Sequence, residues 1–96
     1  MSKVNVLELP IRFDFQHHVT FTADYEKSLA DKDVTNLQLD FSRVRYLDSS
    51  ALGMMVLLAK KARASDAIVK LEVTGAHGAA RDILEMANIS KFYQIK

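Results

Sequence analysis

The strongest constraint on the fold is the junction at Asp48-Ser49-Ser50, where an apolar, strand-like run meets a long helical one. From Ser49 to about Ala64 the residues are mainly Ala, Leu, Met and Lys, which favour helices. Asp and Ser are preferred at helix starts, because a side-chain oxygen accepts hydrogen bonds from unpaired N–H groups of the first turn. A helix start also carries partial positive charge and tolerates an anion. A serine here is therefore either a plain helix cap or a place for a phosphate.

Strand-like and helical runs alternate along the rest of the chain. Strand patterns occur at residues 4–9, 37–41 and 68–73, and helical patterns at residues 14–29, 49–64 and 79–87. Such alternation implies an α/β domain whose helices cross over between neighbouring strands of an at least partly parallel sheet. Ligands and chemistry gather beyond the carboxyl ends of such strands. The Asp48-Ser49-Ser50 junction lies at one of these ends, so the fold and the motif indicate the same place.

Length and composition limit the classes of protein to which this chain can belong. Ninety-six residues, 49% of them hydrophobic and 26% charged, predict one small domain over residues 1–96. Thirteen basic residues balance 12 acidic ones, which argues against direct binding of nucleic acid. The absence of cysteine excludes disulfides and thiolate metal sites. No apolar run has the form of a signal peptide or reaches membrane-spanning length, so we expect a cytoplasmic protein without membrane insertion.

Catalytic and metal sites have little support in the sequence. A serine hydrolase needs a base and an oxyanion hole, and Ser49 lacks the Gly-x-Ser-x-Gly elbow. The adjacent His17 and His18 point to different helix faces, and no carboxylate cluster stands at ligand spacing around them or His77. We therefore expect no intrinsic catalysis, no metal and no cofactor.

The string Tyr46-Leu47-Asp48-Ser49-Ser50-Ala51-Leu52-Gly53 closely resembles the signature of STAS domains, the anti-sigma factor antagonist family. Residues 7–15 and 83–92 are similar to the family's first-strand region and last helix, so the resemblance covers nearly the whole chain. It implies one small α/β domain with a mixed, partly parallel sheet of about four strands and helices packed mainly on one side. Many members have Gly where this chain has Ala51, and Ala favours helix over Gly by about 0.5–1 kcal/mol.

By position, the resemblance implies phosphorylation of Ser49, with Asp48, Ser50 and Asp14 as its neighbours. Family members bind a protein partner when unmodified, typically an anti-sigma factor that is also their serine kinase, and phosphorylation releases them. The expected partners are thus this kinase and a serine phosphatase, with the chain itself a monomer or weak dimer. An alternative keeps the fold without the switch: a constitutive STAS subunit of a larger complex, such as an ABC-type lipid transport system.

The helix after Ser49 suggests where a partner binds. One face has core spacing and consists of Leu52, Met55, Val56 and Ala59. A second face is more apolar than a one-sided surface helix needs and consists of Ala51, Met54, Leu58 and Lys61. Our hypothesis is that this second face contacts the partner, since Met adapts well at contacts. The alternative is that it packs under the last helix.

Overall fold

The structure is a computed structural model that describes residues 3–65, 68 and 70–96. Its strands are β1 (Lys3–Glu8), β2 (Arg12–Phe13), β3 (Val34–Asp40), β4 (Tyr46–Leu47), β5 (Lys70–Thr74) and β6 (Gln94–Ile95). Its helices are α1 (His18–Ala30), α2 (Ser49–Ala64) and α3 (Gly78–Met86), with 3-10 turns η1 (Phe15–His17) and η2 (Ile89–Lys91). The bounds of α2 agree with the sequence prediction. The strand predicted at residues 68–73 appears as β5, and its Val69 lies outside the described residues.

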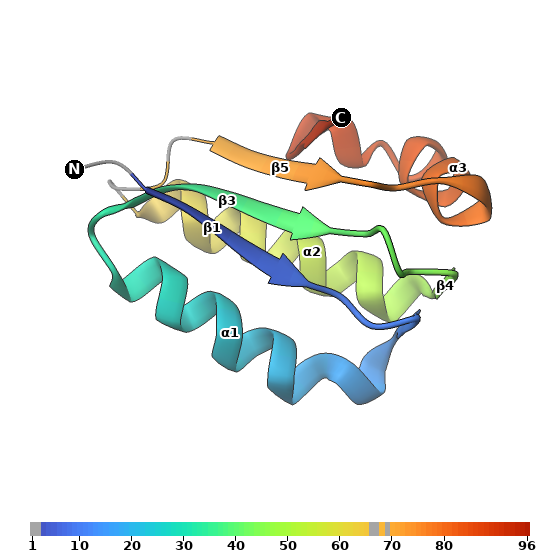
Figure 1. The fold of residues 1–96 in the computed structure, drawn as a ribbon, viewed down its shortest axis with the longest axis horizontal. Coiled ribbons are helices and arrows are strands. Elements are labelled where there is room, and N and C mark those ends of the chain that lie inside the picture. Colours follow the sequence, from blue (N-terminus) through green and yellow to red (C-terminus); the bar gives the residue numbers. More distant parts are fainter. Residues whose placement is uncertain (1–2, 66–67, 69) are drawn as a thin grey trace.

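The main sheet has the strand order β1-β3-β5-β6, and α1 and α2 lie on one of its faces (Figure 1). The predicted α/β class, the four strands and the one-sided helices are confirmed. All the pairings recorded in this sheet are parallel, where a mixed sheet was expected. The reason is that α1 and α2 each return the chain to the end of the sheet where the preceding strand began.

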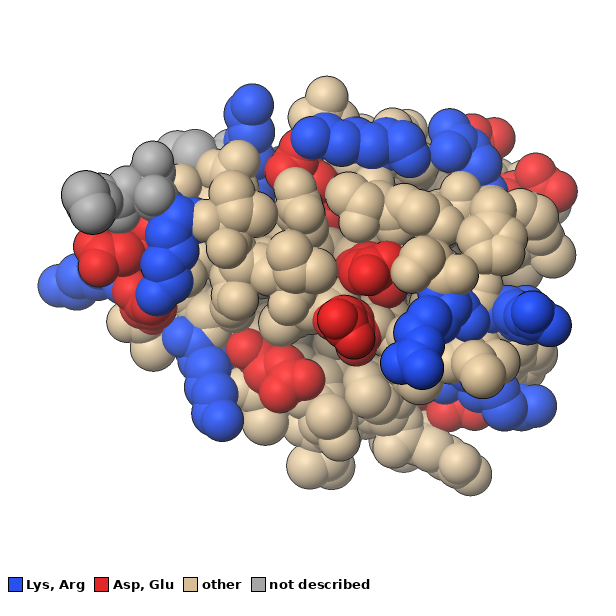
Figure 2. Space-filling model, in the orientation of Figure 1, with Lys and Arg blue, Asp and Glu red and all other residues tan. Residues whose placement is uncertain are grey.

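The core lies between the sheet and its two helices. Side chains from alternate positions of the strands, such as Leu37, Leu39 and Val73, are buried there together with Phe21 of α1 and Met55 of α2. The strands lie in front of α2 in Figure 1, so Figure 2 shows the opposite face of the sheet, which is largely uncharged with acidic side chains near its centre. One face of the sheet therefore makes the core, and no helix of the described residues covers the other.

The C-terminal segment docks on the domain through apolar residues. Asn88 ends α3 in the left-handed conformation with φ 58°, which Asn tolerates better than most residues. Ile89 and Tyr93 beyond it are buried, and the Tyr93 hydroxyl donates to the Met55 carbonyl at 2.6 Å. Within the described ranges, no helix is long and apolar enough to cross a membrane.

Candidate functional site

Two very short strands bring the predicted site residues together. β2 and β4 pair in parallel, with Arg12 opposite Tyr46 and Phe13 opposite Leu47. Each strand is followed at once by an aspartate, Asp14 after β2 and Asp48 after β4. Because parallel strands keep their register, the two aspartates leave the pair side by side at the same end.

Buried aromatic rings hold this strand pair in place. The Phe13 ring is fully buried, with its centroid 5.1 Å from that of Phe21 and 6.0 Å from that of Phe41. On the outer side, the Arg12 guanidinium lies 4.5 Å from the Tyr46 ring centroid, and its Nε is 3.6 Å from Asp14 Oδ2. The apolar residues thus fix both strands, while their polar neighbours remain at the surface.

Asp48, and not Ser49, caps α2. Its Oδ1 accepts a hydrogen bond from the Ala51 N–H at 2.9 Å, and its backbone is extended, as an N-cap requires. Ser49 and Ser50 occupy the exposed first turn, and neither hydroxyl has a hydrogen-bond partner in the part of the chain that the structure describes. The first turn of α2 therefore presents two free hydroxyls to solvent beside a capped helix start.

Asp14 has a similar capping role on the neighbouring segment. The helical pattern predicted at residues 14–29 begins at this residue, but Asp14 caps the 3-10 turn η1, where its carboxylate accepts from the Gln16 N–H at 3.0 Å. The long helix α1 begins only after this turn, at His18, and has no side-chain cap. The first turn of α1 contains the β-branched Val19 and Thr20, which favour helix less than most residues.

Among the described residues, Ser49 has no hydrogen-bonded side chain that could act as a base, and the histidines make other contacts. His17 packs edge-on against Phe13 with ring centroids 6.0 Å apart, and His77 Nε2 is 3.1 Å from the Ser42 carbonyl oxygen. No cluster of three or more His, Cys, Asp or Glu side chains that would hold a metal occurs among the residues described. The site can accept a modification or a partner, and the carboxylates of Asp14 and Asp48 follow the two paired strands beside it.

The face of α2 that we predicted to contact a partner is largely buried. Ala51 and Leu58 are 0% exposed and Met54 is 7% exposed, which contradicts the exposure that the hypothesis requires. Lys61 alone is at the surface, with its Nζ 5.4 Å from the Tyr25 ring centroid. The physical reason is the position of α2 in the middle of the helical layer: α1 packs beside it, the sheet covers it, and the C-terminal segment bonds to it.

The exposed part of α2 near Ser49 is a different stripe, which the sequence analysis missed. We call Ser50, Gly53 and Leu57 the α2 stripe; they recur at spacings of three and four and are all exposed, Leu57 by 46%. A Cβ built on Gly53 would meet no heavy atom within 4 Å, so open space lies over the helix there. The sequence feature that could have indicated this stripe is Gly53, a glycine inside a run of good helix formers.

Exposed apolar side chains also lie on the neighbouring β2–β4 segment. Ile11, just before β2, is 58% exposed, Phe15, just after it, is 64% exposed, and Tyr46 of β4 is 45% exposed. The backbone N–H groups of Arg45 and Tyr46 both donate to the Ile11 carbonyl, at 2.9 and 3.1 Å, which ties these two loops together. The end of the molecule that bears Ser49 thus combines free hydroxyls with unusually exposed apolar groups.

Comparisons by sequence find related proteins. A family model described as "Mlab, STAS domain" matches residues 2–95. A STAS-domain containing protein of Pseudomonas aeruginosa is 32% identical over 89 residues, which is 93% of this chain and 84% of that protein.

Solved structures with the same fold share less sequence. A Thermotoga maritima protein assigned as an anti-sigma factor antagonist has a TM-score of 0.76 at 19% identity, over 96% of this chain and 77% of that one. The antagonist SpoIIAA in its unphosphorylated form has a TM-score of 0.72 at 14% identity, over 100% and 81%. Phosphorylated SpoIIAA of Bacillus has a TM-score of 0.68 at 16% identity, over 100% and 85%. At these identities the likeness is one of fold.

Proposed function

The chain belongs to the STAS domain family, and we propose that it is an anti-sigma factor antagonist whose binding to a protein partner is switched by phosphorylation of Ser49. The observation that carries this proposal is the free, exposed Ser49 hydroxyl in the first turn of α2, where Asp48 already provides the cap. The solved neighbours of the same fold that are described as anti-sigma factor antagonists support it. The partner is an anti-sigma factor that also acts as the serine kinase, and a serine phosphatase restores the unmodified form.

Phosphorylation of Ser49 should change the binding surface more than the stability of the fold. A phosphate adds about −1.5 to −2 charge at neutral pH. The N-terminus of α2 stabilises that charge by about 0.3–1 kcal/mol, while the nearby carboxylates of Asp48 and Asp14 repel it. A partner that covers Ser49 must remove water from the dianion, and a loss of about 3 kcal/mol already lowers affinity roughly a hundredfold.

The partner's contact surface in this proposal is the α2 stripe together with the exposed apolar groups beside it. Gly53 supports this assignment, because a glycine within a helix is destabilising by about 0.5–1 kcal/mol relative to alanine. No packing within the described chain explains the cost, since nothing lies over Gly53. Close approach of a partner's backbone explains it. We therefore propose this surface as the partner contact in place of the face formed by Ala51, Met54 and Leu58, which is buried.

Mass spectrometry and quantitative pull-downs from the protein's own cells test the switch. We expect phosphate on the peptide that contains Ser49, and a partner that Ser49→Ala captures but Ser49→Asp loses by at least about tenfold in affinity. Ala23→Asp is the matched control, since it adds the same charge at an exposed position of α1 outside both proposed surfaces. Equal capture of partner by all three variants would refute the switch.

A constitutive subunit of a larger complex, such as an ABC-type lipid transport system, is the second candidate. Two observations favour it: the family model is described as Mlab, and the carboxylates of Asp14 and Asp48 flank the first turn where a dianion would form. The same pull-downs separate the two functions. A constitutive subunit predicts an unphosphorylated Ser49 and recovery of the same transport complex with the Ala and Asp variants.

A further inference from the structure

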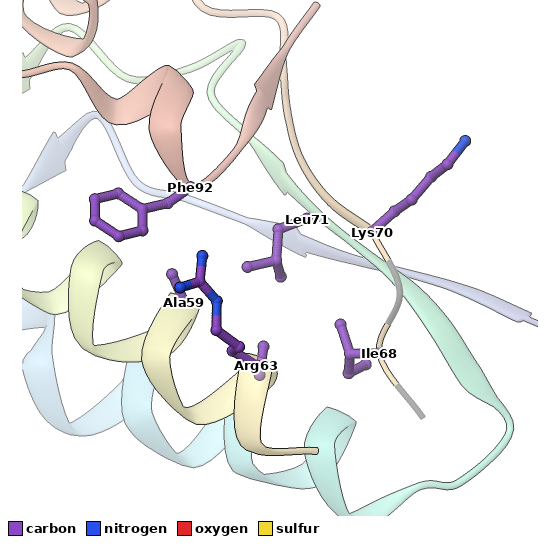
Figure 3. A pocket seen from close by; sticks show the side chains of 7 residues that line it. Ala59, Arg63, Ile68, Lys70, Leu71 and Phe92 are labelled. Atoms are coloured by element: carbon purple, nitrogen blue, oxygen red, sulfur yellow. The ribbon is translucent and has the colours of Figure 1, made fainter. Parts of the chain in front are cut away.

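A second surface lies at the opposite end of α2 from Ser49. A cavity of about 250 Å³ opens there between the last turns of α2, the start of β5 and Phe92 (Figure 3). It is lined by the apolar residues Ala59, Ala62, Ile68, Leu71 and Phe92 together with Arg63 and Lys70. A depression of about 410 Å³ continues from it along Leu71 and Phe92 to Lys91. With a rise of about 1.5 Å per helical residue, this groove is roughly 20 Å from Ser49.

The groove runs beside a free strand edge. β5 pairs with β3 along its whole length, from Lys70 to Thr74, but with β6 only at Glu72 and Val73. Across the described strands, Lys70 and Leu71 therefore have a neighbour on one side only. An unpaired edge offers backbone N–H and C=O groups to another extended chain.

Three cations border the groove: Arg63, Lys70 and Lys91. All three are exposed, and none forms an ion pair or hydrogen bond with another described residue. The groove thus combines apolar side chains with three exposed positive charges, of which Lys70 also interacts electrostatically with Glu72.

We propose that this groove binds an extended, acidic segment of a protein partner, with an apolar side chain in the cavity and acidic side chains on either side of it. Side chains alternate along a strand: Leu71 points into the cavity, whereas Lys70 points away from it (Figure 3). A segment lying along the β5 edge alternates in the same way. Its apolar residue meets Leu71 and Phe92, and its carboxylates meet Lys70, Lys91 and Arg63.

Chemical-shift titration of the full chain tests this proposal. The probe is a blocked pentapeptide with a central phenylalanine and acidic residues at the other positions, and its control replaces the acidic residues by lysine. We expect the acidic peptide to shift the backbone amide signals of Lys70, Leu71 and Phe92 at up to millimolar concentration, and the lysine peptide to leave them unchanged. The double variant R63E/K70E should weaken binding about tenfold or more.

Two further variants test whether binding of the acidic peptide depends on overall charge or on the Ser49 site. Lys27→Glu reverses an exposed charge on α1 and should bind the acidic peptide as the wild type does, and so should Ser49→Asp. Absence of shifts at Lys70 and Leu71, or equal binding by R63E/K70E and the wild type, would overturn the proposal. Decanoate that produces the same shifts while the acidic peptide does not would assign the groove to an amphipathic lipid instead.

Discussion

At the scale of single residues, Asp48 decides what Ser49 can do. Both residue types cap helices well, and a chain with only one of them at this junction would use it for that purpose. Here the Asp48 carboxylate bonds to the Ala51 N–H at 2.9 Å, and the serine hydroxyl next to it stays free. A modification of Ser49 therefore does not remove the bond that starts α2.

This division of roles predicts the stability of two variants at Asp48. Asp48→Ala should lower the free energy of unfolding by about 1 kcal/mol, because the first turn of α2 loses its cap, whereas Asp48→Asn should remain close to the wild type. Urea denaturation followed by circular dichroism measures both. Ser49→Ala serves as the control and should change stability by less than about 0.5 kcal/mol; a larger loss than that of Asp48→Ala would mean that Ser49 is the cap.

At the scale of elements, α2 shows which features of a helix sequence periodicity predicts and which it does not. Its bounds, its start and its apolar character follow from local sequence, because helix propensity and capping act within one or two turns. The side of α2 that is buried does not follow from local sequence. The spacing of Met54 and Leu58 shows that they share a face, but α1, which is distant in the sequence, determines that the face is covered.

The two sides of α2 should respond differently to the same substitution. Met54→Asp places an unpaired charge in the core and should destabilise the domain by more than about 3 kcal/mol, whereas Leu57→Asp lies in the exposed α2 stripe and should cost little. Thermal melting distinguishes them. If Leu57→Asp keeps its melting temperature and loses the partner that Ser49→Ala captures, the stripe is the contact surface; retained melting of Met54→Asp would contradict the buried assignment.

At the scale of the whole molecule, polar contacts on the open face of the sheet join β3, β5 and the C-terminal residue. Glu72 of β5 is only 2% exposed, although it points away from the helices. Its carboxylate accepts from Gln38 Nε2 at 3.1 Å and from Lys96 Nζ at 2.6 Å. The ammonium of Lys96 and the amide of Gln38 lower the pKa of Glu72 below its ordinary value of 4.5.

This network predicts how stability depends on pH. A carboxyl group whose pKa is lower in the folded state contributes stability above its unfolded pKa, and this contribution is lost as the pH falls through the folded value. Wild type should therefore lose stability from about pH 5 downward more steeply than Glu72→Gln, which should already be less stable at pH 7. Urea denaturation from pH 7 to pH 3 measures this difference. Glu85→Gln is the control, since its pair with Arg81 is exposed and should contribute little; identical slopes for wild type and Glu72→Gln would exclude the coupling.

By itself, the sequence determined the α/β alternation, the limits of α2 and the polar junction at Asp48-Ser49-Ser50. These features depend on periodicity, propensity and capping, which act over a few residues. Only the tertiary structure decided which side of α2 is buried, that Asp14 leaves β2 beside Asp48, and that the short β6 leaves the edge of β5 open. These features depend on contacts between segments far apart in the chain, and a local pattern shows which residues share a face but not what covers that face.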